Sequence, residues 1–345
     1  MVVSHAGEQP ASRRPIRLAL SLVGLAVGLA VASRLVRSYR KFDPTGGHPL
    51  ELPPGEETTV TTDDAAVLNV WSSKCVEGAE SEASLPTVVF VHGLATDLTM
   101  WAPVARRLGE LGFKTIAYDQ RGHGQSTLGA EAISADRLAR DLRCVVEALE
   151  LSDVVVVGHS AGGIVAESLL VHATDEFASR LLACVLCSTG STTRKLDAVS
   201  EAIIAAFTGS SIIERIVSIR AVGRVLFTGF AGPIQPAAHV AAALHGYMQS
   251  PGHVRVAMLK VTQSDYMNLL ATVRTPVTVV IGDDDRYVPP ARARELASEI
   301  PGASFSEIRG VAHMVPFEAP DELAAVIDSV YRDARQEILG GRSRR

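Results

Sequence analysis

Polar side chains far apart in the sequence could together turn a hydroxyl group into a nucleophile. Ser160 lies in GHSAGG, with Gly158 and Gly162 two positions away on either side. A serine hydroxyl reacts poorly at neutral pH unless a histidine accepts its proton and a carboxylate orients that histidine. Consecutive aspartates in IGDDDRYVPP and then His313 in RGVAHMVPFEAP follow later in the chain. A serine, an aspartate and a histidine are therefore the residue types that acyl transfer through a serine requires.

The residues around Ser160 predict the bend that would expose it. The valines at 154–157 form a short β-branched run, which is typical of a buried strand in a parallel sheet. From Gly162 onward the pattern favours a helix. A Gly-x-Ser-x-Gly turn between a strand and a helix leaves the serine Oγ exposed, because only small neighbours fit so sharp a bend. The pattern alone also occurs by chance, and its place between a strand and a helix favours catalysis.

The histidine and the aspartates also fall at predicted strand ends. His313 is the only one of the ten histidines in the loop after the last predicted strand, residues 303–310. The aspartates close the preceding predicted strand, which begins at residue 275. An exposed loop histidine without a chemical role is the alternative. The carboxylates at the neighbouring strand end favour a general base instead.

Segments typical of strands alternate with segments typical of helices along most of the chain. The predicted strands are two runs within residues 57–74, followed by residues 87–93, 114–119, 154–160, 181–188, 275–283 and 303–310. Repeated strand-helix units imply an α/β fold, with a mostly parallel sheet and helices on both faces. Residues 191–270 interrupt the alternation with apolar helical segments. We therefore expect a helical cap inserted after the sixth strand.

On these residues and their order, the chain over residues 57–335 resembles the α/β-hydrolase superfamily. In that family the acid of the triad lies in a G-x-x-D-x-x-x-P pattern, which residues 282–289 match. The resemblance therefore implies Asp285 as the acid, beside Ser160 and His313. Asp283 and Asp284 are then expected to be turn and helix-cap residues.

The resemblance also implies two backbone N–H donors for the oxyanion. One would be the amide of Ala161, directly after the nucleophile, and the other the amide of Leu94. We expect His92 to position this loop through hydrogen bonds. The stretch DQRGHGQS resembles a structural D-x-R-G-x-G-x-S segment of the family, so Arg121 and His123 are given no catalytic role.

A serine nucleophile distinguishes this chain from the dehalogenases and epoxide hydrolases of the same fold, which carry aspartate there. We expect ester hydrolysis through an acyl-enzyme, so the protein is a carboxylesterase or lipase-like enzyme. An acyltransferase, a thioesterase or a carbon-carbon bond hydrolase would use the same triad, and a cofactor-free peroxidase side reaction stays open. A peptidase is less favoured, because the cap has no acidic cluster. A non-catalytic binding protein of this fold would usually lack a triad member.

The cap sequence favours an apolar substrate. Its apolar residues either line an acyl pocket or only seal the cap onto the core. On the first interpretation the substrate carries an apolar or lipid-like acyl group. The residues in question are Ile203, Ile204, Phe207, Ile212, Ile213, Ile216, Val217, Leu226, Phe227 and Phe230.

The N-terminal segment predicts a membrane anchor. Residues 18–33 carry no charge, and the apolar run reaches residue 36 if Arg34 extends its charge to the interface, which is about the length of one span. A cleaved signal peptide ending before Ser33 is the alternative, but the basic stretch RLVRSYRK behind the run favours a retained anchor. The flanking charges favour a cytoplasmic catalytic domain by a small margin. Gly24 and Gly28 form G-x-x-x-G, which could support a homodimer.

These observations divide the chain into segments and exclude some functions. The segments are a tail and anchor at 1–41 (span about 18–36), a linker at 42–56, a core at 57–190 and 271–335, a cap at 191–270, and a basic tail at 336–345. A net charge of −5 without basic stripes gives no signal for nucleic acid. No H-E-x-x-H and no G-x-G-x-x-G after a strand occurs, so neither a metal nor another cofactor is expected. Reduced, buried thiols are expected at Cys75, Cys144, Cys184 and Cys187.

Overall fold

One mixed sheet organises the part of the chain that the structure describes. The computed structural model describes residues 51–74, 86–190, 208–210, 215–216, 222–223 and 237–342. Within these ranges eight strands lie in the order β1-β2-β4-β3-β5-β6-β7-β8. They are β1 (Gly55–Thr61), β2 (Val67–Ser73), β3 (Thr87–Val91), β4 (Lys114–Tyr118), β5 (Val154–His159), β6 (Leu181–Cys187), β7 (Val277–Gly282) and β8 (Ser304–Ile308). β2 runs antiparallel to β1 and β4, and the other neighbouring strands are parallel, which confirms the mostly parallel sheet.

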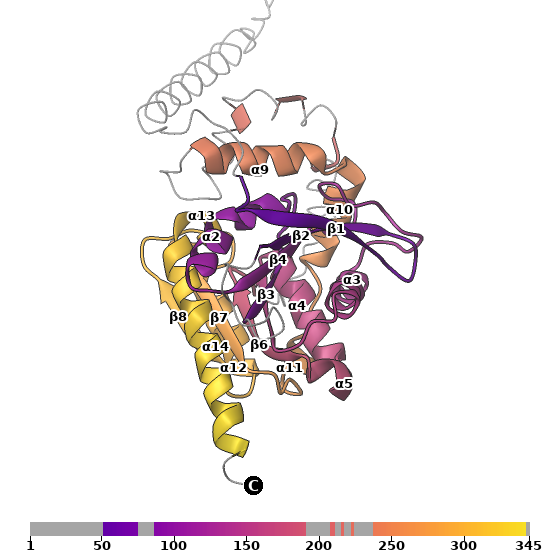
Figure 1. Cartoon of the computed structure of the whole chain (residues 1–345). Helices are drawn as coiled ribbons and strands as arrows, with labels where there is room; N and C mark the ends of the chain where they lie inside the picture. Colours follow the sequence, from indigo (N-terminus) through magenta and orange to yellow (C-terminus); the bar gives the residue numbers. More distant parts are fainter. Residues whose placement is uncertain are drawn as a thin grey trace, which may run out of the picture.

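Helices cover both faces of this sheet. They are η2 (Leu98–Trp101), α2 (Ala102–Glu110), α3 (Ala135–Ala148), α4 (Ala161–His172), α5 (Asp175–Ala178), α9 (Ala237–Gln249), α10 (Gly252–Val261), α11 (Met267–Leu270), α12 (Pro290–Glu299), α13 (Val315–Glu318) and α14 (Pro320–Arg342). Residues of α3, α4 and α12 pack in one buried cluster, and residues of α2 and α14 pack in the other. Figure 1 shows α14, in yellow, on one side of the sheet and α3 and α4 on the other.

The valine run of β5 supplies both buried clusters. Val154 and Val156 pack under α3 and α4, whereas Val155 and Val157 pack under α2 and α14. Successive side chains of a strand point to opposite faces. A run without polar residues is therefore what a strand covered on both sides requires.

The cysteines of β6 follow the same rule. Cys184 lies in the first cluster and Cys187 in the second, as expected for positions three apart on a strand. Both are buried free thiols, and burial raises the pKa of Cys187 to about 12. Cys144 is only partly buried, and Cys75 lies outside the described residues.

The connection from β6 to β7 carries the helices expected for a cap. Helices α9, α10 and α11 fall within residues 191–270, and Figure 1 shows α9, in orange, over the end of the sheet where α13 also lies. Of the apolar residues proposed to line an acyl pocket, only Ile216 is among the described residues, and it is 42% exposed. The closing helix α14 continues to Arg342, through most of the segment expected as a basic tail.

The predicted anchor at 18–36, Gly24 and Gly28, and the linker up to residue 50 all lie outside the described residues. Within the described ranges, no helix combines the length and the apolar character that a membrane span needs.

A buried ion network ties the loop after β4 to the rest of the core. The Arg121 guanidinium donates to both oxygens of Asp141 at 2.6 Å and to both oxygens of Asp64 at 2.8 and 2.9 Å. Arg137 also donates to Asp141, at 3.0 Å from Nη2, and to Asp63. The network joins the β1–β2 turn, this loop and α3, which is a structural role for Arg121.

We expect Arg121→Met to destabilise the fold strongly, because Asp64 and Asp141 lose a buried guanidinium between them. Removing one partner of a buried pair costs about 3–5 kcal/mol. Arg332→Met is the matched control, since Arg332 pairs with Asp328 at the surface with its side chain 66% exposed. An exposed pair contributes at most about 1 kcal/mol. Urea unfolding measures both free energies of unfolding, and equal losses would contradict the structural role of the network.

Candidate active site

Ser160 occupies a strained bend between β5 and α4. Its backbone is left-handed, with φ 53° and ψ −118°, and its N–H donates to the Cys187 carbonyl at 2.9 Å. A Cβ at Gly162 would lie 2.3 Å from the Val91 carbonyl oxygen, and one at Gly158 would lie 2.4 Å from the Gly162 carbonyl oxygen. Both flanking positions therefore require glycine, and the bend holds Ser160 at the carboxyl end of β5.

The structure brings Ser160, His313 and Asp285 together. The Ser160 Oγ lies 3.1 Å from His313 Nε2, and His313 Nδ1 lies 2.8 Å from Asp285 Oδ2. Because a carboxylate only accepts, Nδ1–H donates to it and Nε2 is free to accept the serine proton. The second oxygen of Asp285 accepts from the backbone N–H groups of Tyr287 and Val288, at 2.8 and 2.9 Å. The aspartate is thus fixed on both oxygens, and it orients the histidine.

The neighbouring aspartates have other partners. Asp283 accepts from the Gly310 N–H at 2.6 Å, which ties the end of β7 to the turn after β8. Asp284 uses its backbone N–H, which donates to the Val311 carbonyl at 3.0 Å. Asp283 and Asp284 both lie in a turn, as expected. Neither aspartate caps α12, whose N-cap is Pro289, so the expected helix cap is wrong.

Two side chains hold the backbone of the His313 loop, and neither was expected from the sequence. His159 donates from Nε2 to the His313 carbonyl at 2.9 Å. Glu318 accepts from the Ala312 N–H at 3.0 Å and from the Met314 N–H at 2.9 Å. The loop is therefore bound at the histidine itself and on both sides of it. Because their partners are backbone groups, residue types alone could not have identified these contacts.

The ring of His159 stays neutral beside the site. It is buried, and burial, followed by the proximity of His313, lowers its pKa to about 3. A neutral ring with its proton on Nε2 donates to the carbonyl without placing a positive charge next to the base. His159 therefore positions His313 and does not compete with it for a proton.

The loop after β3 contains Leu94, the residue expected to donate to the oxyanion, and its backbone is held by hydrogen bonds. The Gly93 carbonyl accepts from His92 Nδ1–H at 2.8 Å and from the Thr96 hydroxyl at 3.0 Å, while His92 Nε2 accepts from the Gln120 N–H at 2.9 Å. Burial lowers the pKa of His92, which keeps this ring neutral. A Cβ at Gly93 would lie 3.3 Å from the Ser160 Cβ, so the Gly93–Leu94 peptide adjoins the nucleophile.

Carbonyl and N–H point in opposite directions across a planar trans peptide. Holding the Gly93 carbonyl therefore also holds the Leu94 N–H. The Ala161 N–H begins α4, where the first amides of a helix lack intrahelical acceptors and the helix dipole favours negative charge. His92 is thus hydrogen-bonded within this loop, and its role in positioning the Leu94 N–H stays a prediction.

Another aromatic ring borders the base. The Tyr287 ring lies 5.2 Å from the His313 ring, measured between centroids, and the residue is 56% exposed. Tyr287 follows Asp285 by two positions, so the turn that fixes the acid also places this ring on an open side of the site.

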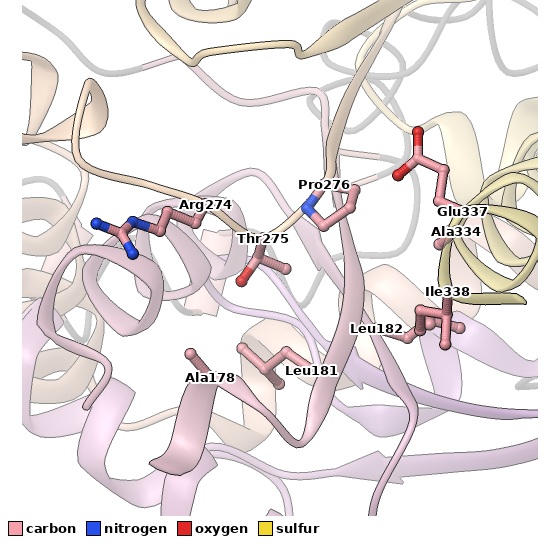
Figure 2. Close-up of a pocket in the computed structure, with 9 residues that line it drawn as sticks. All are labelled: Ala178, Leu181, Leu182, Arg274, Thr275, Pro276, Ala334, Glu337 and Ile338. Carbon is pink, nitrogen blue, oxygen red and sulfur yellow. The ribbon is translucent and has the colours of Figure 1, made fainter. Parts of the chain in front are cut away.

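A separate depression lies away from these residues. Its volume is about 380 Å³, and Figure 2 shows the residues that line it. Among them, Leu181 begins β6 and Pro276 directly precedes β7. The lining residues are Ala178, Leu181, Leu182, Arg274, Thr275, Pro276, Ala334, Glu337 and Ile338. Ser160 and Asp285 follow the carboxyl ends of β5 and β7, so this depression lies at the opposite edge of the sheet. Among the described residues, no three metal-ligating side chains gather at one place.

Buried neutral histidines should make stability depend on pH. Burial lowers the pKa of His123 and of His159 to about 3, from 6.5 for the free side chain. Between these pH values the unfolded chain binds protons that the folded chain does not, so the free energy of unfolding falls as the pH falls below about 6.5. In His123→Gln, one proton fewer is taken up on unfolding, so the slope of the free energy of unfolding against pH should decrease by about 1.4 kcal/mol per pH unit. Urea unfolding at pH 5.5 and 4.5 measures both slopes, and equal slopes would contradict a buried neutral His123.

Comparison with known proteins identifies the family of this chain. The chain matches the alpha/beta hydrolase family over residues 88–326. It is 28% identical over 241 residues to a non-heme chloroperoxidase from Kitasatospora aureofaciens, covering 66% of this chain and 86% of that protein. It is 23% identical over 258 residues to an sn-1-specific diacylglycerol lipase from Mus musculus, covering 72% and 82%. An esterase from Exiguobacterium antarcticum superposes with a TM-score of 0.68 at 18% identity, covering 80% of this chain and 100% of that chain. The resemblance noted in the sequence is confirmed, and this chain belongs to the alpha/beta hydrolase family.

Proposed function

We propose that the protein hydrolyses carboxylic esters through an acyl-enzyme on Ser160. The observation that carries this proposal is the continuous hydrogen-bonded path from Ser160 Oγ through His313 to Asp285, at 3.1 and 2.8 Å. A base within this distance of a presented hydroxyl is what serine acyl transfer needs.

In acylation, the Ser160 Oγ attacks the ester carbonyl carbon, and His313 Nε2 takes the hydroxyl proton. The tetrahedral intermediate collapses as the bond from carbon to the leaving oxygen breaks. His313 then gives its proton to that oxygen, so an alcohol leaves and the acyl group stays on Ser160. Asp285 stabilises the imidazolium that forms between these transfers.

In deacylation, water takes the place of the alcohol. His313 accepts a proton from the water as its oxygen attacks the acyl carbon, and the proton then returns to Ser160 as the carboxylic acid leaves. In both steps the carbonyl oxygen becomes negative, and the N–H groups of Leu94 and Ala161 are assigned to stabilise it. Each such donor contributes about 3 kcal/mol to the barrier reduction.

The leaving group must lie against His313, because this residue protonates it. Tyr287, with its ring 5.2 Å from that of His313 and open to solvent, is placed to contact the alcohol. Apolar or aromatic alcohols suit such a contact.

An apolar acyl group is the substrate class that we favour. It is supported by the apolar composition of the cap, and a relative of this chain is named a diacylglycerol lipase. An acyltransferase would form the same acyl-enzyme and then use an alcohol in place of water. Hydrolysis is distinguished from transfer by whether added alcohol changes the product from a free acid to a new ester.

Substitutions in the triad should separate its three roles. We expect Ser160→Ala to abolish ester hydrolysis, and Asp285→Asn to lower kcat by about 10⁴-fold, because the histidine loses its orienting acceptor. Asp284→Asn is the matched control, since it makes the same change one position away and should leave kcat near the wild-type value. Stopped assays with p-nitrophenyl esters measure these rates, and thermal unfolding checks that each variant is folded. A larger loss in Asp284→Asn or Asp283→Asn than in Asp285→Asn would contradict the assignment of the acid.

The length of the acyl chain should affect kcat/KM. Each methylene that becomes buried contributes up to about 0.8 kcal/mol, which corresponds to about fourfold in rate. We therefore expect p-nitrophenyl esters of about six to ten carbons to react faster than the acetate. Parallel assays of the Ser160→Ala variant subtract spontaneous hydrolysis. A steady fall from acetate to longer chains would refute the apolar acyl group while leaving the triad intact.

A further inference from the structure

We infer that helix α9 fixes the position of the Leu94 N–H, the proposed oxyanion donor, through the close approach of Gly246 to Thr96. This inference rests on the proposed function, because it concerns the same acyl-transfer site. It assigns to Gly246 the part of a positioning residue, acting through Thr96 and the Gly93 carbonyl.

Helix α9 contacts the loop between β3 and η2 and the helix α13 that follows the His313 loop. Near its start, His239 stacks on Phe317 of α13, with ring centroids 4.8 Å apart and planes 15° apart. The loop of His313 leads directly into α13. Further along α9, Gly246 is buried against the loop between β3 and η2. The helix is therefore in contact with α13, next to the His313 loop, at one point and with the loop between β3 and η2 at another.

The contact at Gly246 leaves no room for a side chain. A Cβ there would lie 2.8 Å from the Thr96 Cα, 3.0 Å from the Thr96 carbonyl carbon and 3.1 Å from the Asp97 nitrogen. All three are main-chain atoms, so no side-chain rotation could relieve the clash. Glycine weakens a helix interior relative to alanine, and this close approach gives a reason for its presence within α9.

Thr96 connects this contact to the Gly93–Leu94 peptide. Its hydroxyl donates to the Gly93 carbonyl at 3.0 Å, beside the bond from His92 to the same oxygen. Ala95 between them has a left-handed backbone, with φ 54°, which folds the loop back so that Thr96 reaches Gly93. Because the Gly93–Leu94 peptide is planar, a shift of its carbonyl turns the Leu94 N–H as well.

The far end of this loop is fixed independently. The Leu98 N–H donates to Asp119 Oδ1 at 2.9 Å, and Asp97 accepts from the Thr99 N–H at 2.9 Å. A displacement of Thr96 is therefore not accommodated by a movement of the loop toward η2. It acts on the segment between Gly93 and Thr96, which includes the donor.

A substitution at position 246 tests the chain of contacts. In Gly246→Ala, an ordinary contact of 3.4 Å instead of 2.8 Å requires a main-chain shift of several tenths of an ångström. Misplacing a catalytic group by about 1 Å costs on the order of 100-fold, so we expect the rate to fall by about 10- to 100-fold. The readout is the second-order rate constant for labelling of Ser160 by a fluorophosphonate. In this reaction the Oγ–P bond forms, fluoride leaves and His313 takes the proton, so no natural ester is needed.

Three further variants show whether the effect runs through Thr96. Thr96→Val removes the hydroxyl and should slow labelling, whereas Thr96→Ser keeps it and should retain a rate near that of the wild type. In the double variant Gly246→Ala with Thr96→Val, the rate should be no lower than in the slower single variant, because both changes break one link. Gly109→Ala is the matched control, since a Cβ at this position in α2 would meet nothing within 4 Å.

The inference is overturned if Gly246→Ala is labelled at the wild-type rate, or if the two changes multiply in the double variant. If Gly246→Ala does not fold, as judged by thermal unfolding, the Thr96 pair decides. A wild-type labelling rate in Thr96→Val would then contradict a role for the Thr96 hydroxyl. Slow labelling of Thr96→Val together with a normal rate in Thr96→Ser would support that role. Failure of the wild-type protein itself to be labelled would instead overturn the proposed function.

Discussion

The left-handed backbone at Ser160 is the constraint on which the site depends. An L-residue rarely adopts φ near 53° unless its surroundings enforce it. Here β5 is buried on both faces, the Ser160 N–H is bound to the carbonyl of Cys187, and Gly162 lies against the end of β3. The core therefore stabilises a bend that the local sequence alone would not favour. This bend both exposes the Ser160 hydroxyl and leads directly into α4.

The remaining groups of the site are held through backbone contacts around that bend. His159 and Glu318 bind the main chain of the His313 loop, and His92 and Thr96 bind the Gly93 carbonyl. His313 and the Gly93–Leu94 peptide are thereby held by neutral or acceptor side chains, which add no positive charge beside the base. Such positioning before the substrate arrives is the main source of electrostatic catalysis.

Local patterns in the sequence predict the strands and helices of the site better than they predict the contacts between those elements. The valine run and the two glycines around Ser160 predict a strand, a bend and a helix because each is a short-range constraint. The choice of Asp285 among three aspartates comes from the resemblance to the family's G-x-x-D-x-x-x-P pattern, since residue type is the same at all three positions. The roles of Glu318 and Gly246 could not be predicted from the sequence. Both residues contact main-chain atoms of distant segments, and such contacts do not depend on the type of the residue contacted. The helix cap expected at Asp283 or Asp284 is wrong for a local reason, because α12 begins only at Pro290 and its N-cap is Pro289.

We propose that the bend at Ser160 places its Oγ between one base and two amides. A crystal structure of the protein phosphonylated at Ser160 would test this arrangement. We expect a phosphonyl oxygen about 2.7–3.1 Å from both the Leu94 and the Ala161 nitrogens, with His313 still bound to Asp285. A phosphonyl oxygen directed to solvent, or bound by neither amide, would contradict it.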